Sequence, residues 1–361
     1  MRVTLVTSSL GGGGAERVLT TLANYWADAG WPVTIVTIAD NAVEVEYPLD
    51  PRIAVTRLSM HKPSASVRGA ISGNLERLRA LRAAIRESKP DGVISFITTN
   101  NVLTRFSTFG IRTPIIVSER VVYKHPTLAL PWRILRSVAY AFSTALVVQT
   151  ADSVSDVPRL LRPKVRVIPN PVPPGPQKQQ APSSTRKKLV AMGRLAPEKG
   201  FDMLLEAFAR VAPNHPDWGL TIWGEGDMRD ALMRQRDALG LGNRVNLPGV
   251  TKTPREKLAE SDLFALSSRR EGFPNALCEA MAAGLPVISF ACRVGPSTII
   301  TNEVDGILVP ANDVDALAAS LDRLMSDEPL RRRLGEQARS IVDRFSLPTV
   351  AAQWEALIQA R

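Results

Sequence analysis

The chain has 361 residues, of which 45% are hydrophobic, 22% charged and 6% aromatic. This length predicts two domains, and the composition excludes intrinsically disordered, collagen-like and disulfide-rich proteins. The net charge of +10 lies almost wholly in residues 1–170, which carry net +9 against net +1 for residues 171–361.

The first segment, Met1 to Leu10, is a short apolar run that ends at four glycines. It is too short for the core of a signal peptide and lacks a small-residue cleavage site. No stretch reaches the roughly 18 uncharged apolar residues of a membrane span, so we expect a cytoplasmic protein. The two cysteines, Cys278 and Cys292, fit a reducing compartment and lack the paired ligands of a zinc site.

Strand and helix patterns alternate in the first half. Residues 3–7 predict a strand, apolar residues between 18 and 26 recur at helical spacing, and residues 33–38 predict another strand. Gly13 and Gly14 precede the helix and would let a ligand approach backbone N–H groups, although a simple tight turn is the alternative. The dinucleotide and P-loop fingerprints both fail here, which argues against hydride transfer and P-loop hydrolysis.

Basic residues gather in two further segments of this half. Residues 67–89 predict a helix, and Trp132 to Arg136 form a second basic and apolar patch. Such charge suits an anionic lipid surface or a phosphorylated substrate, whereas nucleic acid is disfavoured because no reader motif is present. The alternative is a solvated basic face over a core-facing stripe. The helix carries Arg68, Arg77, Arg79, Arg82, Arg86 and Lys89, with Leu75, Leu78, Leu81 and Ile85 as the stripe.

A proline-rich stretch divides the chain. Residues 171–185 have no apolar period, and their prolines disfavour both helix and central strand. We therefore expect a domain over 1–170, a linker over 171–185, a second domain over 186–344 and a terminal helical segment over 345–361. Strand–helix alternation on both sides of the linker predicts two doubly wound α/β domains, with a ligand cleft between them.

Three segments of the second half follow predicted strands and are candidates for one ligand site. The strands are expected at 188–192, 220–223 and 263–266, with a helix over 201–211 and another strand at 287–290. After the first strand, Arg194 and Lys199 offer a guanidinium fork and a point charge that suit a diphosphate, unless they are merely solvated. After the second, Gly224 and Glu225 belong to a glycine turn.

The third segment contains two glutamates. Pro274 blocks a helix ahead of Asn275, so Glu271 lies in the loop and Glu279 in the second helical turn. The backbone N–H groups near the helix start suit an anion, and Glu279 can accept hydrogen bonds from a ribose diol. An acid early in a helix that only complements the macrodipole is the alternative for Glu279.

One aspartate pair remains as a possible metal ligand. Asp313-Val314-Asp315 opens a helical pattern, and we interpret it as a helix cap. It is the only Asp-x-Asp motif in the sequence. We expect no metal and no cofactor.

The segment from Ser268 to Ser289 resembles the signature of retaining GT-B glycosyltransferases of family 4, the group 1 type. Its two glutamates, Glu271 and Glu279, have the E-x7-E spacing of that family. Further motifs fall in the family's order: Gly-Gly-Ala-Glu-Arg at 13–17, Ser-Glu-Arg at 118–120, Ile-Pro-Asn-Pro at 168–171, Gly-Arg-Leu-x-x-Glu-Lys-Gly at 193–200 and Gly-Pro-Ser at 295–297. The resemblance spans essentially the whole chain.

The resemblance implies the GT-B fold, with two Rossmann-like domains facing a cleft, and a set of site residues. Arg194 and Lys199 would bind the donor diphosphate, and Glu271 with the backbone of Gly272, Phe273, Pro274 and Asn275 would hold the donor sugar. Glu279 would hold the ribose, Gly224 and Glu225 would line the donor site, and Gly13 and Gly14 would approach the phosphates. On the acceptor side we expect Thr98, Asn100, Glu119 and Arg120. The terminal helix would pack on the first domain.

The leading hypothesis is therefore a retaining, metal-independent transferase that uses a nucleoside-diphosphate sugar, UDP rather than GDP. Its acceptor would be a glycan or a polyprenyl-diphosphate-linked glycan, and the basic first half would seat it on the cytoplasmic face of an anionic membrane. A UDP-sugar 2-epimerase and a non-catalytic sugar-nucleotide or glycan-binding protein are the alternatives. The motifs identify neither the sugar nor the linkage.

Overall fold

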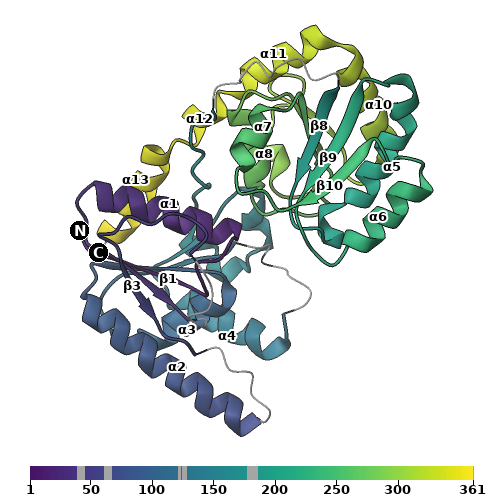
Figure 1. Cartoon of the computed structure of the whole chain (residues 1–361). Helices are drawn as coiled ribbons and strands as arrows, with labels where there is room; N and C mark the ends of the chain where they lie inside the picture. The colour runs from purple at the N-terminus through teal and green to yellow at the C-terminus, as the bar shows by residue number, and fades with distance from the viewer. Residues whose placement is uncertain (39–44, 61–66, 121–122, 124–127, 177–185, 361) are drawn as a thin grey trace. The chain divides into compact units, whose positions relative to one another are not determined.

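The computed structural model describes residues 1–38, 45–60, 67–120, 123, 128–176 and 186–360 (Figure 1). The chain forms two compact units. The first comprises Met1–Pro171 together with Leu347–Arg361, and the second comprises Val172–Ser346.

The first unit is built on a parallel seven-stranded sheet in the order β3-β2-β1-β4-β5-β6-β7. Its strands are β1 (Val3–Thr7), β2 (Val33–Thr37), β3 (Ala54–Arg57), β4 (Gly92–Phe96), β5 (Ile115–Ser118), β6 (Ala145–Val148) and β7 (Val165–Val167). Its helices are α1 (Gly14–Asp28), α2 (Val67–Ser88), α3 (Thr98–Ser107), α4 (Leu130–Ala141), α13 (Leu347–Gln359) and the 3₁₀ turns η1 (Asp152–Asp156) and η2 (Arg159–Lys164).

Alternate residues of these strands face two apolar layers. Leu5 and Ile94 pack with α1 and α13 on one face of the sheet. Val6 and Val93 pack with α2 on the other face, where α4 also lies farther along the sheet. Because both faces are covered, the strands are apolar throughout, as a doubly wound parallel sheet requires.

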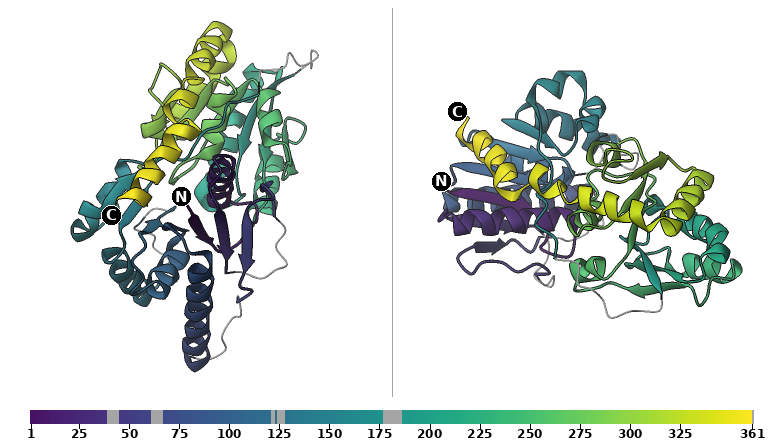
Figure 2. Two further views of the ribbon diagram at one scale, coloured as in Figure 1. Left: turned by 90° about the vertical axis from the view of Figure 1, so that its left-hand side faces the viewer. Right: turned by 90° about the horizontal axis from the view of Figure 1, so that it is seen from above.

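The last helix of the chain completes the core of the first unit. Trp354 of α13 is fully buried, and its ring lies 6.0 Å from that of Phe96 at the end of β4. Trp26 of α1 donates a hydrogen bond to Glu355 over 3.0 Å. Figures 1 and 2 show α13 in yellow beside the purple α1, with the two chain ends close together. Residues distant in sequence therefore share one core.

The second unit contains a parallel six-stranded sheet in the order β10-β9-β8-β11-β12-β13. The strands are β8 (Lys187–Met192), β9 (Trp218–Trp223), β10 (Val245–Gly249), β11 (Leu263–Leu266), β12 (Val287–Ala291) and β13 (Ile307–Pro310). The helices are α5 (Phe201–Val211), α6 (Arg229–Ala238), α7 (Pro254–Ala259), α8 (Asn275–Ala282), α9 (Pro296–Ile299), α10 (Val314–Ser326), α11 (Glu328–Ala338) and α12 (Ile341–Arg344), with 3₁₀ turns η3 (Pro197–Lys199) and η4 (Ala212–Asn214). Helices α5 and α10 pack on one face, and α8 on the other.

Each sheet has one place where the strand order reverses. In the first unit this point lies between β1 and β4, and in the second between β8 and β11. Loops at the carboxyl ends of such strand pairs leave in opposite directions and open a crevice, which is where doubly wound domains bind ligands. The candidate segments of the second half that contain Lys199 and Glu271 follow β8 and β11.

Candidate active site

The three second-half segments singled out in the sequence contact one another in the second unit. The N–H of Leu195, after β8, donates to the carbonyl of Glu225, after β9, over 2.8 Å. The hydroxyl of Ser267, after β11, donates to the carbonyl of Lys199 over 3.1 Å. The three loops therefore form a single surface at the carboxyl edge of the sheet.

Glycines allow this close approach. A methyl group at Gly224, where φ is +148°, would overlap the carbonyl oxygen of Gly193. A methyl group at Gly200, where φ is +62°, would overlap the carbonyl oxygen of Ser267. Both positions combine a backbone conformation that favours glycine with the direct contact of another chain segment. Close packing of these loops therefore explains why both positions are glycine.

Lys199 and Glu271 meet at the reversal point between β8 and β11. The Nζ atom of Lys199 lies 2.7 Å from Oε1 of Glu271, and the side chains are 24% and 8% exposed. The hydroxyl of Ser268 donates to the same carboxylate oxygen over 2.6 Å. Ser268 did not stand out in the sequence, since a serine three residues before a glutamate is an unremarkable pattern. The result is a fixed, partly buried cation beside a hydrogen-bonded carboxylate.

A second ion pair joins the same two loops. Arg269 makes a two-pronged contact with Asp202, at 2.8 Å and 2.6 Å, and its backbone N–H donates to the carbonyl of Glu198. The Asp202 carboxylate raises the pKa of Arg269, which holds this pair in its charged form. Neither residue was a candidate from sequence, yet together they fix the loop that carries Lys199 against the loop that carries Glu271.

The other predicted cation has a different partner. Arg194 pairs with Glu198 over 2.5 Å, and its side chain is 70% exposed. Glu225 likewise forms a surface pair with Arg229 over 2.7 Å. The structure therefore brings Lys199 and Glu271 together, but it engages Arg194 in a separate pair.

Helix α8 begins at Asn275, as the sequence predicts, with Pro274 at its N-cap and no side-chain cap. Gly272 and Phe273 lead into it, and a methyl group on Gly295 would come within 3.2 Å of the Gly272 carbonyl. Glu279 lies in the second turn and is buried. The first turn of α8 thus follows Glu271 in the same segment of the chain, and its N-cap residue supplies no side-chain acceptor.

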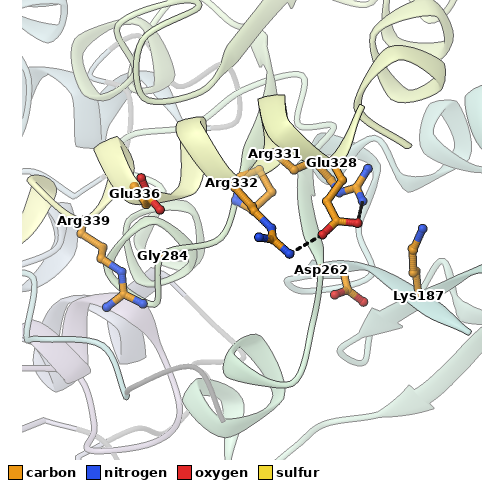
Figure 3. Close-up of a pocket in the computed structure, with 9 residues that line it drawn as sticks. Lys187, Asp262, Gly284, Glu328, Arg331, Arg332, Glu336 and Arg339 are labelled. Carbon is orange, nitrogen blue, oxygen red and sulfur yellow. Dashed lines mark hydrogen bonds and ion pairs between the residues drawn. The ribbon is translucent and has the colours of Figure 1, made fainter. Parts of the chain in front are cut away.

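A pocket lies at the opposite, amino edge of the same sheet. It encloses about 460 Å³. Its lining includes Lys187 at the start of β8, Asp262 before β11 and arginines of α11 (Figure 3). Its charged groups pair largely with one another, as Glu328 does with Arg332 over 2.6 Å. We assign the candidate site to the carboxyl edge instead, because the reversal point and the loops that meet there lie at that edge.

In the first unit, the glycine loop contacts a side chain that the sequence did not single out. Gly13 is the N-cap of α1, which begins at Gly14. A methyl group on Gly13 would overlap Oε2 of Glu16, whose carboxyl group is buried against it. Burial raises the pKa of Glu16. A side chain at this position would have to displace the Glu16 carboxylate.

The predicted acceptor-side residues form part of a buried network. Thr98 donates to Oε1 of Glu119 over 2.7 Å, and Tyr140 donates to Oε2 over 2.7 Å. Asn100 donates to the carbonyl of Phe96 over 2.9 Å. Burial raises the pKa of Glu119 despite these donors. Thr98, Asn100 and Glu119 are thus all engaged in contacts within the unit.

Arg120 differs from these neighbours. Its guanidinium stacks on the ring of Phe96 at 4.5 Å and donates to the side chain of Asn170. In the part of the chain that the structure describes, its Nε and Nη2 atoms are buried without a hydrogen-bond partner. Burial lowers the pKa of Arg120 to about 9. Two donors of a buried cation therefore remain available at the carboxyl edge of the first sheet.

The backbone is strained at the carboxyl edge of the first sheet. Ile97, between β4 and Thr98, has φ +75°. A β-branched residue rarely adopts this conformation, which costs of the order of 1–3 kcal/mol and is concentrated at functional sites.

Asp313 caps α10, because its carboxylate accepts from the N–H of Ala316 over 2.9 Å, which confirms the predicted cap. Among the described residues, no group of three or more histidine, cysteine or acidic side chains is arranged to hold a metal ion. None of the described helices is long and apolar enough to span a membrane.

Comparison with known proteins matches both halves of the chain to glycosyltransferases. Residues 176–341 match the family Glycosyl transferases group 1, and residues 12–175 match Glycosyltransferase Family 4. Among solved structures, sucrose-phosphate synthase of Thermosynechococcus elongatus has a TM-score of 0.84 at 19% identity, over 99% of this chain and 98% of that one. HepE of Anabaena has a TM-score of 0.83 at 20% identity, over 99% of both chains. These two likenesses confirm the GT-B class of fold.

Two curated relatives differ in how much of their length the chain covers. An exopolysaccharide phosphotransferase of Streptomyces coelicolor is 40% identical over 54% of this chain, but the chain spans only 21% of that protein. A Campylobacter jejuni enzyme, GalNAc-alpha-(1->4)-GalNAc-alpha-(1->3)-diNAcBac-PP-undecaprenol alpha-1,4-N-acetyl-D-galactosaminyltransferase, is 30% identical over 99% of this chain and 98% of its own. The chain therefore belongs to the group 1 glycosyltransferases.

Proposed function

We propose that the chain is a retaining, metal-independent hexosyltransferase whose donor is a nucleoside-diphosphate sugar, a UDP-sugar in preference to a GDP-sugar. The observation that carries this proposal is the Lys199–Glu271 pair, 2.7 Å apart at the strand-order reversal of the second unit. Membership of the family supports it. The pair supplies a fixed cation for a departing phosphate and a carboxylate for a sugar hydroxyl.

In the proposed reaction, the bond between the sugar's anomeric carbon and the diphosphate oxygen breaks as the acceptor oxygen bonds to that carbon on the same face. The acceptor proton passes to the departing phosphate oxygen. Lys199 and Arg194 stabilise the negative charge that develops, and a preorganised cation of this kind contributes about 2.7–4 kcal/mol to lowering a barrier. The reaction needs no Lewis acid if these cations serve that role.

The remaining donor contacts come from backbone and carboxylate groups. The N–H groups from Gly272 to Asn275 bind the sugar or phosphate, with Phe273 and Pro274 shaping that loop. Glu279 accepts hydrogen bonds from the ribose, and the turn at Gly224 and Glu225 borders the donor. N–H groups of Gly13 and Gly14 would add contacts to the phosphates.

For the acceptor we propose a glycan carried on a polyprenyl diphosphate, used in cell-surface polysaccharide synthesis at the cytoplasmic face of the membrane. The Campylobacter relative is named for a PP-undecaprenol-linked acceptor. Arg120 is the favoured acceptor residue because two of its buried donors lack a partner among the described residues. Thr98, Asn100 and Glu119 would then form the buried part of the acceptor site, next to Arg120.

A panel of UDP- and GDP-sugars tests the proposal, with polyprenyl-diphosphate glycans as acceptors and chelator present throughout. We expect nucleotide release with one donor and a product whose anomeric configuration, measured by NMR, equals that of the donor. An inverted product would contradict retention, and loss of activity with chelator would contradict metal independence. Appearance of an epimerised sugar nucleotide would indicate the epimerase, and donor binding without turnover the binding protein.

A further inference from the structure

Helix α4 in the first unit buries an arginine and exposes an apolar face. Its inner face buries Arg136, which is 4% exposed, together with Ala139 and Tyr140. Its outer face presents Leu130, Ile134, Val138 and Phe142, one residue per turn, at 64%, 57%, 41% and 64% exposure. Residues four apart align along one side of a helix, so these side chains form a continuous apolar ridge.

The orientation of α4 is fixed by the buried arginine. The Arg136 guanidinium lies 3.6 Å from the centre of the Tyr123 ring and donates to the Tyr123 carbonyl over 2.9 Å. It also lies 3.9 Å from the Glu119 carboxylate. Turning the helix to hide the ridge would expose this buried pair to disruption. The sequence predicts Arg136 as part of a basic surface patch; the structure corrects this, because Arg136 is buried beside Glu119.

Loops at the ends of α3 and α4 extend the ridge. Phe109 is 68% exposed, and the Arg105 guanidinium lies 5.9 Å from its ring centre. The same guanidinium donates to the carbonyl of Phe142 over 2.8 Å. Arg82 of α2 donates to the carbonyl of Phe109 over 2.8 Å. Two exposed aromatic rings are therefore joined by arginine side chains at one end of the ridge.

The segment of sequence that carries this ridge is basic. Between Asp91 and Asp152 the only acid in the sequence is Glu119, which is buried. Arg112 and Arg133 are exposed in the same stretch. An apolar ridge in a segment with exposed arginines and no exposed acid between Asp91 and Asp152 complements a bilayer with anionic headgroups.

We infer that the ridge of Leu130, Ile134, Val138 and Phe142, together with Phe109, docks on an anionic phospholipid bilayer. The inference names the partner surface for the membrane-linked acceptor of the proposed function. A second copy of the chain is a poorer occupant, since a two-fold contact of this patch would bring arginines against their own copies.

Vesicle co-sedimentation of the full chain tests the inference, using phosphatidylcholine vesicles with and without phosphatidylglycerol. The variant is Ile134→Gln with Phe142→Gln, and the matched control is Val250→Gln with Val304→Gln, two exposed valines of the second unit. Each lost apolar contact weakens binding by about tenfold when fully buried, so we expect at least a tenfold loss for the variant. The control should bind as wild type does.

Several outcomes separate the possibilities. Binding of wild type only to vesicles with phosphatidylglycerol, weakened by salt and by Arg133→Gln, supports the inference. Wild type that ignores both vesicles, or a ridge variant that binds like wild type, overturns it. So does a wild-type dimer in solution that the ridge substitutions convert to a monomer. Nucleotide release from soluble donor should be unchanged in the ridge variant; absence of release in wild type would sink the proposed function alone.

Discussion

Lys199 and Glu271 are brought together by neighbouring strands rather than by neighbouring sequence. The two residues are 72 positions apart, and they meet because β8 pairs with β11. Their types and loops were predicted from sequence, but the contact was not. Strand order decides it, and local periodicity carries no information about which strands are adjacent.

Removing the carboxylate should leave a partly buried cation without its partner. We expect Glu271→Ala to lower the free energy of unfolding by about 1–3 kcal/mol, and Lys199→Met combined with Glu271→Ala to recover part of that loss. Urea unfolding of wild type, both single variants and the double variant gives the coupling. Strictly additive effects would show that the 2.7 Å pair contributes no coupling to stability.

The close approach of Glu16 to Gly13 can be tested by substitution. We expect Gly13→Ala to destabilise the first unit by about 1 kcal/mol because the added methyl group displaces the Glu16 carboxylate. The same substitution made in a Glu16→Ala background should cost much less. Thermal unfolding of the four proteins measures this, and an equal cost in both backgrounds would refute the role of Glu16.

The buried Glu119 predicts how stability depends on pH. Its native pKa is raised above the ordinary 4.5 by burial, so the folded chain holds this proton to higher pH than the unfolded chain. The associated stability is full below 4.5 and is lost as pH rises through the native pKa. Glu119→Gln cannot titrate, so its unfolding free energy relative to wild type should grow with pH. Urea unfolding at a series of pH values checks this, and a difference that shrinks with rising pH would contradict it.

At the scale of elements, the sequence predicts six of the strands that the structure contains, namely β1, β2, β8, β9, β11 and β12, and misses the others. The bounds of β1, α5 and β11 match the expected ranges, because each is a short apolar or strongly amphipathic run with clear ends. Leu75 was expected in a core-facing stripe, yet it is 46% exposed, since only the later turns of α2 pack on the sheet. Helix α4 was harder still: its buried arginine depends on Glu119, which lies on a different element.

Helix α13 is the element whose loss should affect one unit selectively. Trp354 is fully buried against β4, so we expect Trp354→Ala to destabilise the first unit by about 3–5 kcal/mol. Amide hydrogen exchange should accelerate in β1, β4 and β5 while β8 and β11 stay protected. The exposed neighbour Gln353→Ala is the matched control. Equal acceleration in both units would contradict the assignment of α13 to the first unit.

At the scale of the whole molecule, the excess positive charge and the candidate active site lie in different halves of the chain. The excess positive charge belongs to residues 1–170, and part of it, at Arg112 and Arg133, is exposed in the segment that carries the apolar ridge on α4. The second half is nearly neutral, and its candidate site uses a few fixed cations instead of a general positive field. Composition alone could show the asymmetry, but only the arrangement of elements shows which basic residues reach the surface.

The claim that the carboxyl edge of the second sheet performs the transfer is tested most directly by kcat for sugar transfer. With the donor that the panel identifies, Lys199→Ala should lower kcat by about 100-fold or more, because it removes the cation that we propose faces the departing phosphate. Lys252→Ala, which removes an exposed lysine of the same unit, should leave kcat unchanged. Equal kcat values for wild type, Lys199→Ala and Lys252→Ala would contradict the account.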